Sequence, residues 1–418
     1  MSDAARRPET IYLDNNATTA VAPEVFEAMR PFLTTDYFNP SSVYERATPV
    51  AAALKASRET VARALGGVRP EEIVFTSCAT ESVSHAVRGS IRANPHRNHI
   101  VTTGVEHPAV HELCRDLERD RYDVTFLPVD RSGRIDVADF IRALRTETLL
   151  VAVMHANNET GVVFPIEDLS RLTKETDPSI LFLTDATQTV GKVGIDLRGA
   201  LKHVDLLACS GHKFHAPKGV GALFLRRGTP CRPFLVGGHQ EGGRRGGTEN
   251  VAGIVGLARA LTLSLEEHDA VEERIRRLRD RLQRELIARI PCVEVNGEGA
   301  ARLSNTLNLS IHFIEGEGIL YQLNEHGICA SSGSACTSGS LEPSHVLRAM
   351  GVPFTAVHGS LRLSLSRYTT EEEIDRVVEA LPEIVARLRR LSPYWDQSRN
   401  RPRSEAEAMM RKDPEHTA

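Results

Sequence analysis

Short apolar runs alternate with amphipathic stretches over the first 260 residues, and this alternation leaves few folds open. The runs are rich in leucine and β-branched residues, are bounded by turn residues, and occupy 99–104, 122–129, 148–154, 180–186, 204–210 and 221–226. Between several of them the apolar residues have helical spacing, as in 109–120 and 165–176. Strands that are apolar on both faces and separated by helices are typical of an α/β domain with a mostly parallel sheet.

The pattern changes near residue 260, where we expect a second domain to begin. Apolar residues beyond this point recur at steps of three or four, the spacing of a helix: Val271, Ile275, Leu278, Leu282 and Leu286. The stretch from Ser398 onward is polar and punctuated by proline, which is typical of a mobile tail.

Charge and cysteine content exclude several classes of function. The net charge is −4, so neither nucleic acid nor an anionic membrane is expected as a partner. No run approaches the roughly 18 apolar residues of a membrane span, and the N-terminus lacks the apolar core of a signal peptide, so we expect a cytoplasmic protein. Seven cysteines stand singly, without a C-x-x-C pair, which favours reduced thiols and no resident metal.

Two residues that can carry chemistry follow the predicted strands, at the sheet edge where open parallel sheets bind ligands. Asp185 is either a buried cap for the next turn or the partner of a cationic ring nitrogen. Lys213 is a solvated side chain, a phosphate clamp or an amine nucleophile in a desolvated pocket. No nucleotide-binding glycine motif occurs, which disfavours NTPases and nicotinamide dehydrogenases. A lysine and an acid at one sheet edge are the pair that pyridoxal 5'-phosphate requires.

The phosphate of that cofactor needs neutral donors and a helix N-terminus. Candidates lie at a strand-to-helix turn, beside the lysine and before a long helix: Ala79, Thr80, Ser210, His212 and Thr248. His107 follows another strand, where an imidazole can stack on a flat ring or transfer protons, although such a histidine taken alone is more often structural.

Cys336 lies in the stretch ASSGSACTSGS, residues 330–340, among serines and glycines. These residues give the backbone freedom and supply no apolar side chain to anchor it, so the thiol fits a segment that moves. The alternative is a small buried cysteine in a turn. Cys329, in the apolar stretch HGICA, has the pattern of the buried kind.

Nine motifs together resemble one family of enzymes. They are YLDNNATT, FTSCATES, EHPAV, NNETG, TDATQTVGK, SGHKFHAPKGVG, GGHQEGGRRGGTEN, SSGSACTSGSLEPSH and LSRYTTEEEID, in this order over nearly the whole chain. The chain resembles the NifS/IscS cysteine desulfurases, class-V members of the fold-type I pyridoxal-phosphate enzymes. The stretches CTSGSLEPSH and LSPYW are more similar to the nitrogen-fixation branch, NifS, than to the housekeeping branch.

The resemblance implies catalytic roles for three residues. Lys213 would hold the cofactor as its Schiff-base lysine, Cys336 would accept the sulfur, and His107 would stack on the ring and handle protons. The remaining cofactor-binding residues would be Asp185 at the pyridine nitrogen, Gln188 at the ring oxygen, Asn158, Ala79, and, around the phosphate, Thr80, Ser210, His212 and Thr248. Thr248 would reach over from the other subunit of a homodimer.

The resemblance also implies how the substrate is held. Arg362 would bind the substrate carboxylate, since the arginine fork suits a planar carboxylate better than lysine does. Asn158 would help to orient the substrate, and Asn15 lies in the segment that would close over it. The resemblance implies no metal ion at this site. Cys336 would at most make transient contact with an iron-sulfur cluster held by the sulfur acceptor.

The implied fold has a large domain with a mostly parallel seven-stranded sheet and a smaller α/β C-terminal domain. The expected parts are an N-terminal segment packing with the small domain, a large cofactor-binding domain, a small domain and a flexible tail: 1–20, 21–260, 261–393 and 394–418.

The implied reaction converts L-cysteine to L-alanine and leaves the sulfur as a persulfide on Cys336. An iron-sulfur scaffold protein would accept this sulfur, in nitrogenase maturation. Three alternatives stay open: a selenocysteine lyase, a class-V aminotransferase, which would not need Cys336, and a non-catalytic partner of a scaffold. Comparing the turnover of L-cysteine and L-selenocysteine tests the first alternative, and formation of pyruvate with a keto-acid acceptor would favour the second. The yellow colour of a bound cofactor would argue against the third.

Overall fold

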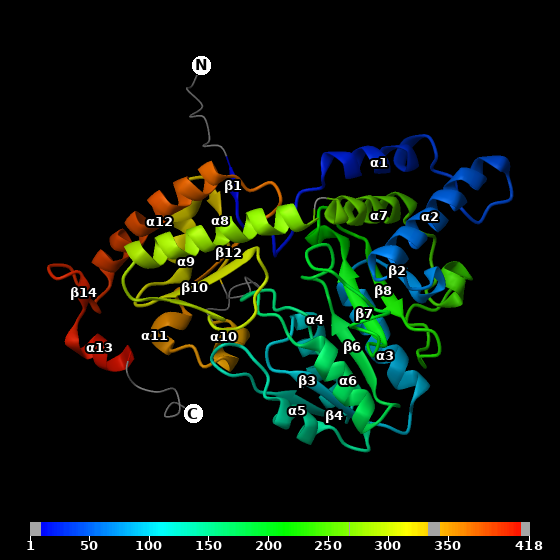
Figure 1. Cartoon of the computed structure of the whole chain (residues 1–418), viewed down its shortest axis with the longest axis horizontal. Coiled ribbons are helices and arrows are strands. Elements are labelled where there is room, and N and C mark those ends of the chain that lie inside the picture. Colours follow the sequence, from blue (N-terminus) through cyan, green and yellow to red (C-terminus); the bar gives the residue numbers. More distant parts are fainter. Residues whose placement is uncertain (1–9, 267, 333–342, 411–418) are drawn as a thin grey trace.

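A seven-stranded sheet in the order β2-β8-β7-β6-β5-β3-β4 forms the centre of the larger part of the molecule (Figure 1). The computed structural model describes residues 10–266, 268–332 and 343–410. The strands are β2 (Ile73–Thr76), β3 (His99–Thr103), β4 (Asp123–Leu127), β5 (Thr148–Ala152), β6 (Leu181–Asp185), β7 (Leu206–Ser210) and β8 (Gly221–Leu225). From β4 to β7 the neighbouring strands are parallel, whereas β8 is antiparallel to both β7 and β2. The prediction of a mostly parallel seven-stranded sheet is therefore confirmed.

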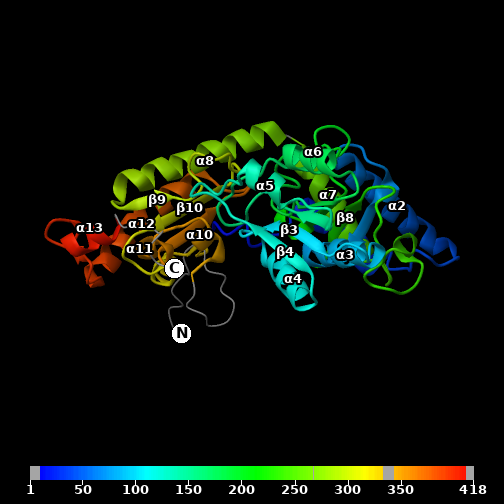
Figure 2. The ribbon, with the colours of Figure 1, turned by 90° about the horizontal axis from the view of Figure 1, so that it is seen from below.

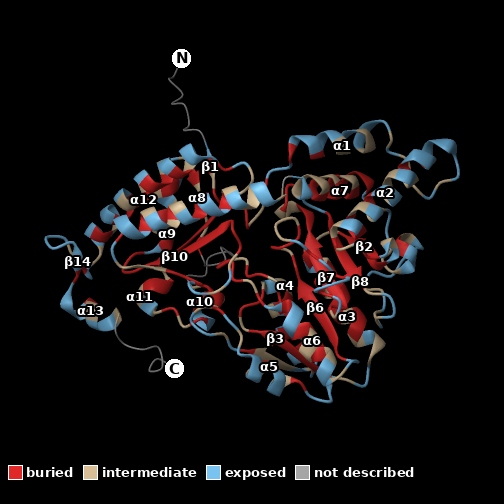
Figure 3. Ribbon diagram, in the orientation of Figure 1, coloured by how far each residue is buried: buried red, intermediate tan, exposed pale blue. Residues whose placement is uncertain are grey.

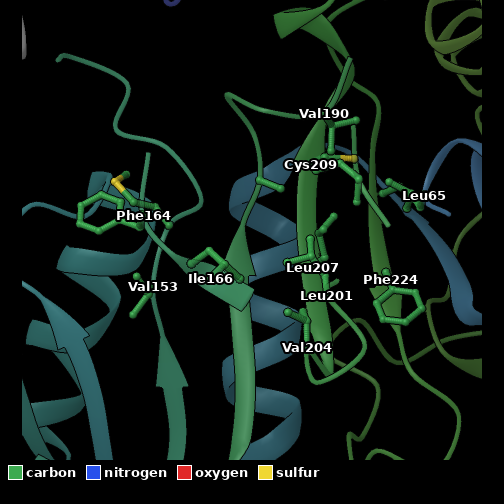
Figure 4. Packing of buried hydrophobic residues seen from close by; sticks show 14 of the residues in the cluster. Leu65, Val153, Phe164, Ile166, Val190, Leu201, Val204, Leu207, Cys209 and Phe224 are labelled. Carbon is green, nitrogen blue, oxygen red and sulfur yellow. The ribbon is translucent and has the colours of Figure 1, made fainter. Parts of the chain in front are cut away.

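Successive residues of these strands pack into two hydrophobic clusters on opposite faces of the sheet, as strand geometry requires. Val74 and Leu150 belong to one cluster, and Phe75 and Val151 belong to the other. The first face is covered by α3 (Ala79–Ala93) and α4 (Pro108–Arg119). The second carries α1 (Pro23–Thr34), α2 (Thr48–Ala64), α5 (Val137–Ala143), α6 (Ile166–Thr176) and α7 (Val251–Leu265). Figure 4 shows the second cluster, and the buried strands stand out in Figure 3.

A second unit with its own hydrophobic cluster lies beside the first in both views of the ribbon (Figure 1 and Figure 2). Its antiparallel sheet has the order β12 (Ser360–Ser364), β10 (Thr306–Ile311), β9 (Val293–Val295). Its helices are α8 (His268–Arg289), α9 (Gly316–Glu325) and α12 (Glu371–Leu391). The short helices α10 (His345–Ala349) and α11 (Phe354–Val357) bury their apolar side chains in the cluster of the larger unit. Four of the apolar positions that predicted the helix are buried on α8: Ile275, Leu278, Leu282 and Leu286.

The start of the chain packs with this smaller unit. β1 (Ile11–Tyr12) pairs in parallel with β11 (Ile328–Cys329), and Leu13 joins the same hydrophobic cluster. The proposed division into an N-terminal segment, a large domain to residue 260 and a small domain from 261 follows these two clusters except at residues 346–357, whose apolar side chains pack with the cluster of the larger unit. Among the described residues, no helix combines the length and the apolar content of a membrane span.

Part of the expected tail, 394–418, has a folded structure. β13 (Trp395–Asp396) pairs with β14 (Arg401–Pro402), and α13 (Ser404–Met410) follows. Trp395 is only 3% exposed, and the guanidinium of Arg389 lies 4.0 Å from the centre of its ring. Burial of this ring, together with the cation–π contact, accounts for the difference from a fully mobile tail.

Candidate active site

A cavity of about 200 Å³ lies where β2, β3, β5, β6 and β7 end. Each of these strands is followed by residues that line it: Cys78, Ala79, Thr80, His107, Ala109, Met154, Ala156, Asn158, Asp185, Thr187, Gln188, Ser210, His212 and Lys213. Nine of them are residues that the sequence assigned to the cofactor. The carboxyl edge of the sheet therefore brings the predicted set together, as the rule for open α/β sheets requires.

Lys213 ends the short helix η3 (Gly211–Lys213), directly after β7. Its Nζ donates hydrogen bonds to the carbonyl oxygens of Asn16, at 2.8 Å, and Ala17, at 2.7 Å. Burial and, to a smaller extent, the positive charge of Arg362 lower the pKa of this amine to about 8, against the opposing effect of Asp185. The amine can therefore exist in its neutral, nucleophilic form near physiological pH.

Asp185 and His107 border the same cavity from neighbouring strands. Asp185 is the last residue of β6, is 5% exposed, and accepts a hydrogen bond from the Thr187 N–H at 2.9 Å. His107 caps α4, because its Nδ1 accepts from the Ala109 N–H at 3.1 Å. Burial lowers the pKa of His107, so the ring is neutral and carries its proton on Nε2.

The cavity contains polar atoms that the protein itself leaves without partners. Ser210 Oγ, Asn158 Oδ1 and Thr187 Oγ1 are buried and make no hydrogen bond within the part of the chain that the structure describes. Cys78, at the N-terminus of α3, has no side-chain capping bond, which leaves the first N–H groups of that helix available. Buried orphan groups and a free helix N-terminus at one cavity fit a phosphorylated ligand. Asp185 fits a protonated pyridine nitrogen, so the residues present suit pyridoxal 5'-phosphate.

Arg362 lies on β12 of the small domain and reaches this cavity through Asn158. Its Nη1 donates to the Asn158 carbonyl at 3.1 Å, and its Nη2 pairs with Asp14 Oδ1 at 2.7 Å. Its Nε is buried and has no partner among the described residues. A buried guanidinium with an unused N–H next to the cavity can bind a carboxylate.

Sequence reasoning chose Asn15, whereas the neighbouring Asn16 makes the contacts at the site. The Asn15 amide donates to the carbonyls of Tyr12, at 3.1 Å, and Ser364, at 2.8 Å, and so ties the N-terminal segment to β12. The Asn16 amide donates to the Asn158 carbonyl at 3.1 Å, and the Asn16 carbonyl accepts from Lys213. Asp14 and Asn16 were missed, although the motif YLDNNATT contains both.

Three other predicted positions have different outcomes. His212 lines the cavity, and its Nδ1 lies 3.1 Å from Thr18 Oγ1. Thr248 is exposed and is absent from the lining of this cavity in the same chain. Cys336 lies outside the described residues.

Comparison with known proteins agrees with this geometry. The family model "Aminotransferase class-V" matches residues 11–377. A cysteine desulfurase of Trichormus azollae is 55% identical over 384 residues, which cover 92% of this chain and 95% of that protein. The cysteine desulfurase NifS of Azotobacter vinelandii is 53% identical over 387 residues, covering 92% and 95%. A solved structure of a NifS-like protein has a TM-score of 0.85 at 37% identity and covers 91% of this chain and 100% of that one.

The family match spans most of the chain, the relatives are more than half identical, and the cavity has the donors and the acid that the family's cofactor needs. The chain therefore belongs to the class-V aminotransferase family and, within it, to the cysteine desulfurases that depend on pyridoxal 5'-phosphate and act on L-cysteine.

Proposed function

We propose that this cysteine desulfurase transfers the sulfur of L-cysteine through Cys336 to an iron-sulfur scaffold protein, in the service of nitrogenase maturation. The observation that carries the proposal is the cavity at the sheet edge, which combines the Lys213 amine, the Asp185 carboxylate and, through Asn158, the Arg362 guanidinium. The nitrogenase role is supported by the 53% identity to NifS of Azotobacter vinelandii and by the NifS-like stretch CTSGSLEPSH.

Residues of the large domain would hold the cofactor. Its phosphate would bind at the N-terminus of α3 with Thr80, Ser210 and His212, and its ring would lie against His107 and Asp185. Gln188 would donate to the ring oxygen, and Lys213 would be the point of covalent attachment. When bound, pyridoxal 5'-phosphate withdraws electrons from the substrate Cα and stabilises the negative charge that develops there.

Two residues prepare the substrate. Arg362 binds the carboxylate of L-cysteine with its N–H groups, and Asn158 helps to orient the substrate between cofactor and clamp. The Lys213 Nζ then takes the proton from Cα, a role for which an amine with a pKa of about 8 is well suited.

Cys336 takes the sulfur. Its thiolate attacks the substrate sulfur, the bond from that sulfur to Cβ breaks, and the electron pair of that bond returns to the carbon skeleton, which gains protons to become L-alanine. One sulfur atom is thereby transferred from L-cysteine to Cys336, which becomes a persulfide. Described residues before and after the stretch that contains Cys336 make contacts of their own: Ser331 N donates to the Arg362 carbonyl at 3.2 Å, and Ser344 Oγ donates to Glu159 at 2.6 Å.

A homodimer is part of the proposal. Thr248 is exposed in its own chain, as expected for a residue that completes the phosphate site of a partner. Large apolar side chains are also exposed on α1, on the loop that follows it and near residue 236, as expected for a surface that a second copy covers: Phe26, Leu33, Tyr37, Val43 and Val236.

Two experiments test the delivery of sulfur. The purified enzyme, L-cysteine, ferrous iron, an apo scaffold protein and a thiol reductant, which reduces the persulfide sulfur to sulfide, should produce alanine and a scaffold-bound cluster in parallel. The Cys336→Ala enzyme should produce neither. Deletion of the gene in its host should reduce nitrogenase activity far more than growth on fixed nitrogen. Equal growth defects under both conditions would assign the enzyme to housekeeping. Faster release of selenium from L-selenocysteine than of sulfur from L-cysteine, or pyruvate as the product, would favour the alternatives.

A further inference from the structure

A second lysine, Lys192, lies beside the cofactor site in the turn after β6. Its Nζ donates to Gln188 Oε1 at 3.0 Å and lies 3.4 Å from Asn16 Oδ1. Gly191, with φ of +80°, precedes it, and a Cβ there would lie 2.7 Å from Phe214 Cβ. Only glycine allows this turn to approach the Lys213 segment so closely, and this approach sets Lys192 next to the active-site lysine.

The charge on Lys192 determines how the Gln188 amide is oriented. In its protonated form the Lys192 amine offers three donors and no acceptor, so the oxygen of Gln188 faces it. The Nε2 group then faces the Asn16 carbonyl, to which it donates at 3.0 Å. In the opposite orientation, N–H groups would face the ammonium and the amide oxygen would face the carbonyl, and both contacts would be repulsive.

The fixed orientation determines what Gln188 presents to the cavity that it lines. One hydrogen of Nε2 is used by the Asn16 carbonyl, and the second has no acceptor among the described residues. Gln188 therefore offers a donor to the cavity. Without Lys192, the Asn16 carbonyl alone would favour this orientation, so the amide would turn more readily and present its oxygen, which would repel an anionic ring oxygen.

We propose that Lys192 is a positioning residue, which fixes the Gln188 amide so that it donates a hydrogen bond to the ring oxygen of pyridoxal 5'-phosphate. This inference rests on the proposed role of Gln188. Lys192 itself is assigned no contact with the cofactor, and it acts through Gln188 and, more weakly, through Asn16.

A purely structural role explains Lys192 poorly. Among the described residues it makes no ion pair, whereas the partly buried Lys174 pairs with Asp205 at 2.6 Å. Burial and, to a smaller extent, the charge of Lys213 lower the pKa of Lys192 to about 7. An ammonium without a carboxylate partner is unfavourable at such a position, where an apolar side chain would stabilise the fold more. Lys174 is therefore a matched control for the loss of a partly buried lysine.

The test is the equilibrium affinity of the full-length apoprotein for pyridoxal 5'-phosphate, with the visible spectrum of the bound cofactor as a second readout. Lys192→Met should weaken binding roughly tenfold, the effect of one charge-assisted hydrogen bond, and should shift the absorbance band. Lys192→Arg, which also has only donors, should restore most of the affinity. Lys174→Met should bind like the wild type. If Lys192→Met does not fold, Lys192→Gln, which accepts both orientations of Gln188, should still weaken binding several-fold.

The double variant decides whether Lys192 acts through Gln188. Gln188→Ala should weaken binding, and Lys192→Met added to Gln188→Ala should cause no further loss. Full additivity of the two losses would overturn the inference, and so would wild-type affinity of Lys192→Met alongside a weakened Gln188→Ala. Wild-type affinity of Gln188→Ala itself would instead remove the proposed role of Gln188, and the inference with it.

Discussion

Replacing Arg362 with lysine tests whether this guanidinium holds the substrate carboxylate. One nitrogen donates to the Asn158 carbonyl, one pairs with Asp14, and Nε is buried without a partner among the described residues. Arginine can donate to a carboxylate from two nitrogens, whereas lysine offers one point charge. The variant therefore loses one charge-assisted hydrogen bond, worth roughly 1.5–3 kcal/mol. This corresponds to substrate binding that is weaker by a factor of roughly 10 to 150.

Alanine formation over a range of L-cysteine concentrations measures the effect. We expect KM to rise by this factor and kcat to change little, because Lys213 and the cofactor stay in place. Arg367→Lys is the matched control: Arg367 Nη1 donates to the Leu263 carbonyl at 2.7 Å, and Arg367 is not among the residues that line the cofactor cavity, so its replacement should leave KM unchanged. Urea unfolding of both variants establishes that they are folded. An unchanged KM in Arg362→Lys, or a loss confined to kcat, would refute the assignment.

Three further predictions concern the cofactor, the subunit boundary and a buried ion pair. Because burial lowers the pKa of Lys213 from 10.5 to about 8, covalent capture of the cofactor by the apoprotein, trapped with borohydride, should accelerate up to about pH 8 and then level off; a rise continuing to 10.5 would contradict this. Mixing Lys213→Ala and Thr248→Ala subunits should create one complete site per heterodimer and raise cofactor affinity above that of either variant, and no gain would count against a shared site. Glu241→Ala should lower the free energy of unfolding in urea by about 3 kcal/mol, since the partly buried Arg58 and the Phe75 N–H lose their partner. A loss below roughly 1 kcal/mol would show that the pair contributes little.

The strands of the large domain could be predicted because they are buried on both faces. All residues of β3, β5, β6, β7 and β8 are buried, so each strand appears in the sequence as a short run in which apolar and β-branched residues dominate. A run has no direction, however, and the antiparallel placement of β8 depends on pairing between Thr76 and Gly221, far apart in the chain. Local pattern therefore predicted six of the seven strands, without β2, and did not predict their order.

The active-site residues also fall into two groups, those that the sequence could predict and those that it could not. Asp185 and Lys213 could be found because each directly follows or ends an apolar run, and strand ends are where ligands bind. Asn16 could not be separated from Asn15, because the direction of each side chain depends on the turn that joins the N-terminal segment to β12. Lys192 was missed because its acceptors, Gln188 and Asn16, come from two distant parts of the chain.

The central claim is that Cys336 carries the sulfur, and mass spectrometry of the enzyme after a single turnover with L-cysteine tests it most directly. Cys336 lies outside the described residues, so the chemical assignment rests on its sequence and on the family. We expect one extra sulfur atom on the peptide that contains Cys336, in the wild type and in Cys329→Ala. Cys336→Ala should retain the yellow cofactor and bind L-cysteine, yet form no persulfide and little alanine. The extra sulfur on Cys329 or Cys231, or a persulfide in Cys336→Ala, would contradict the account.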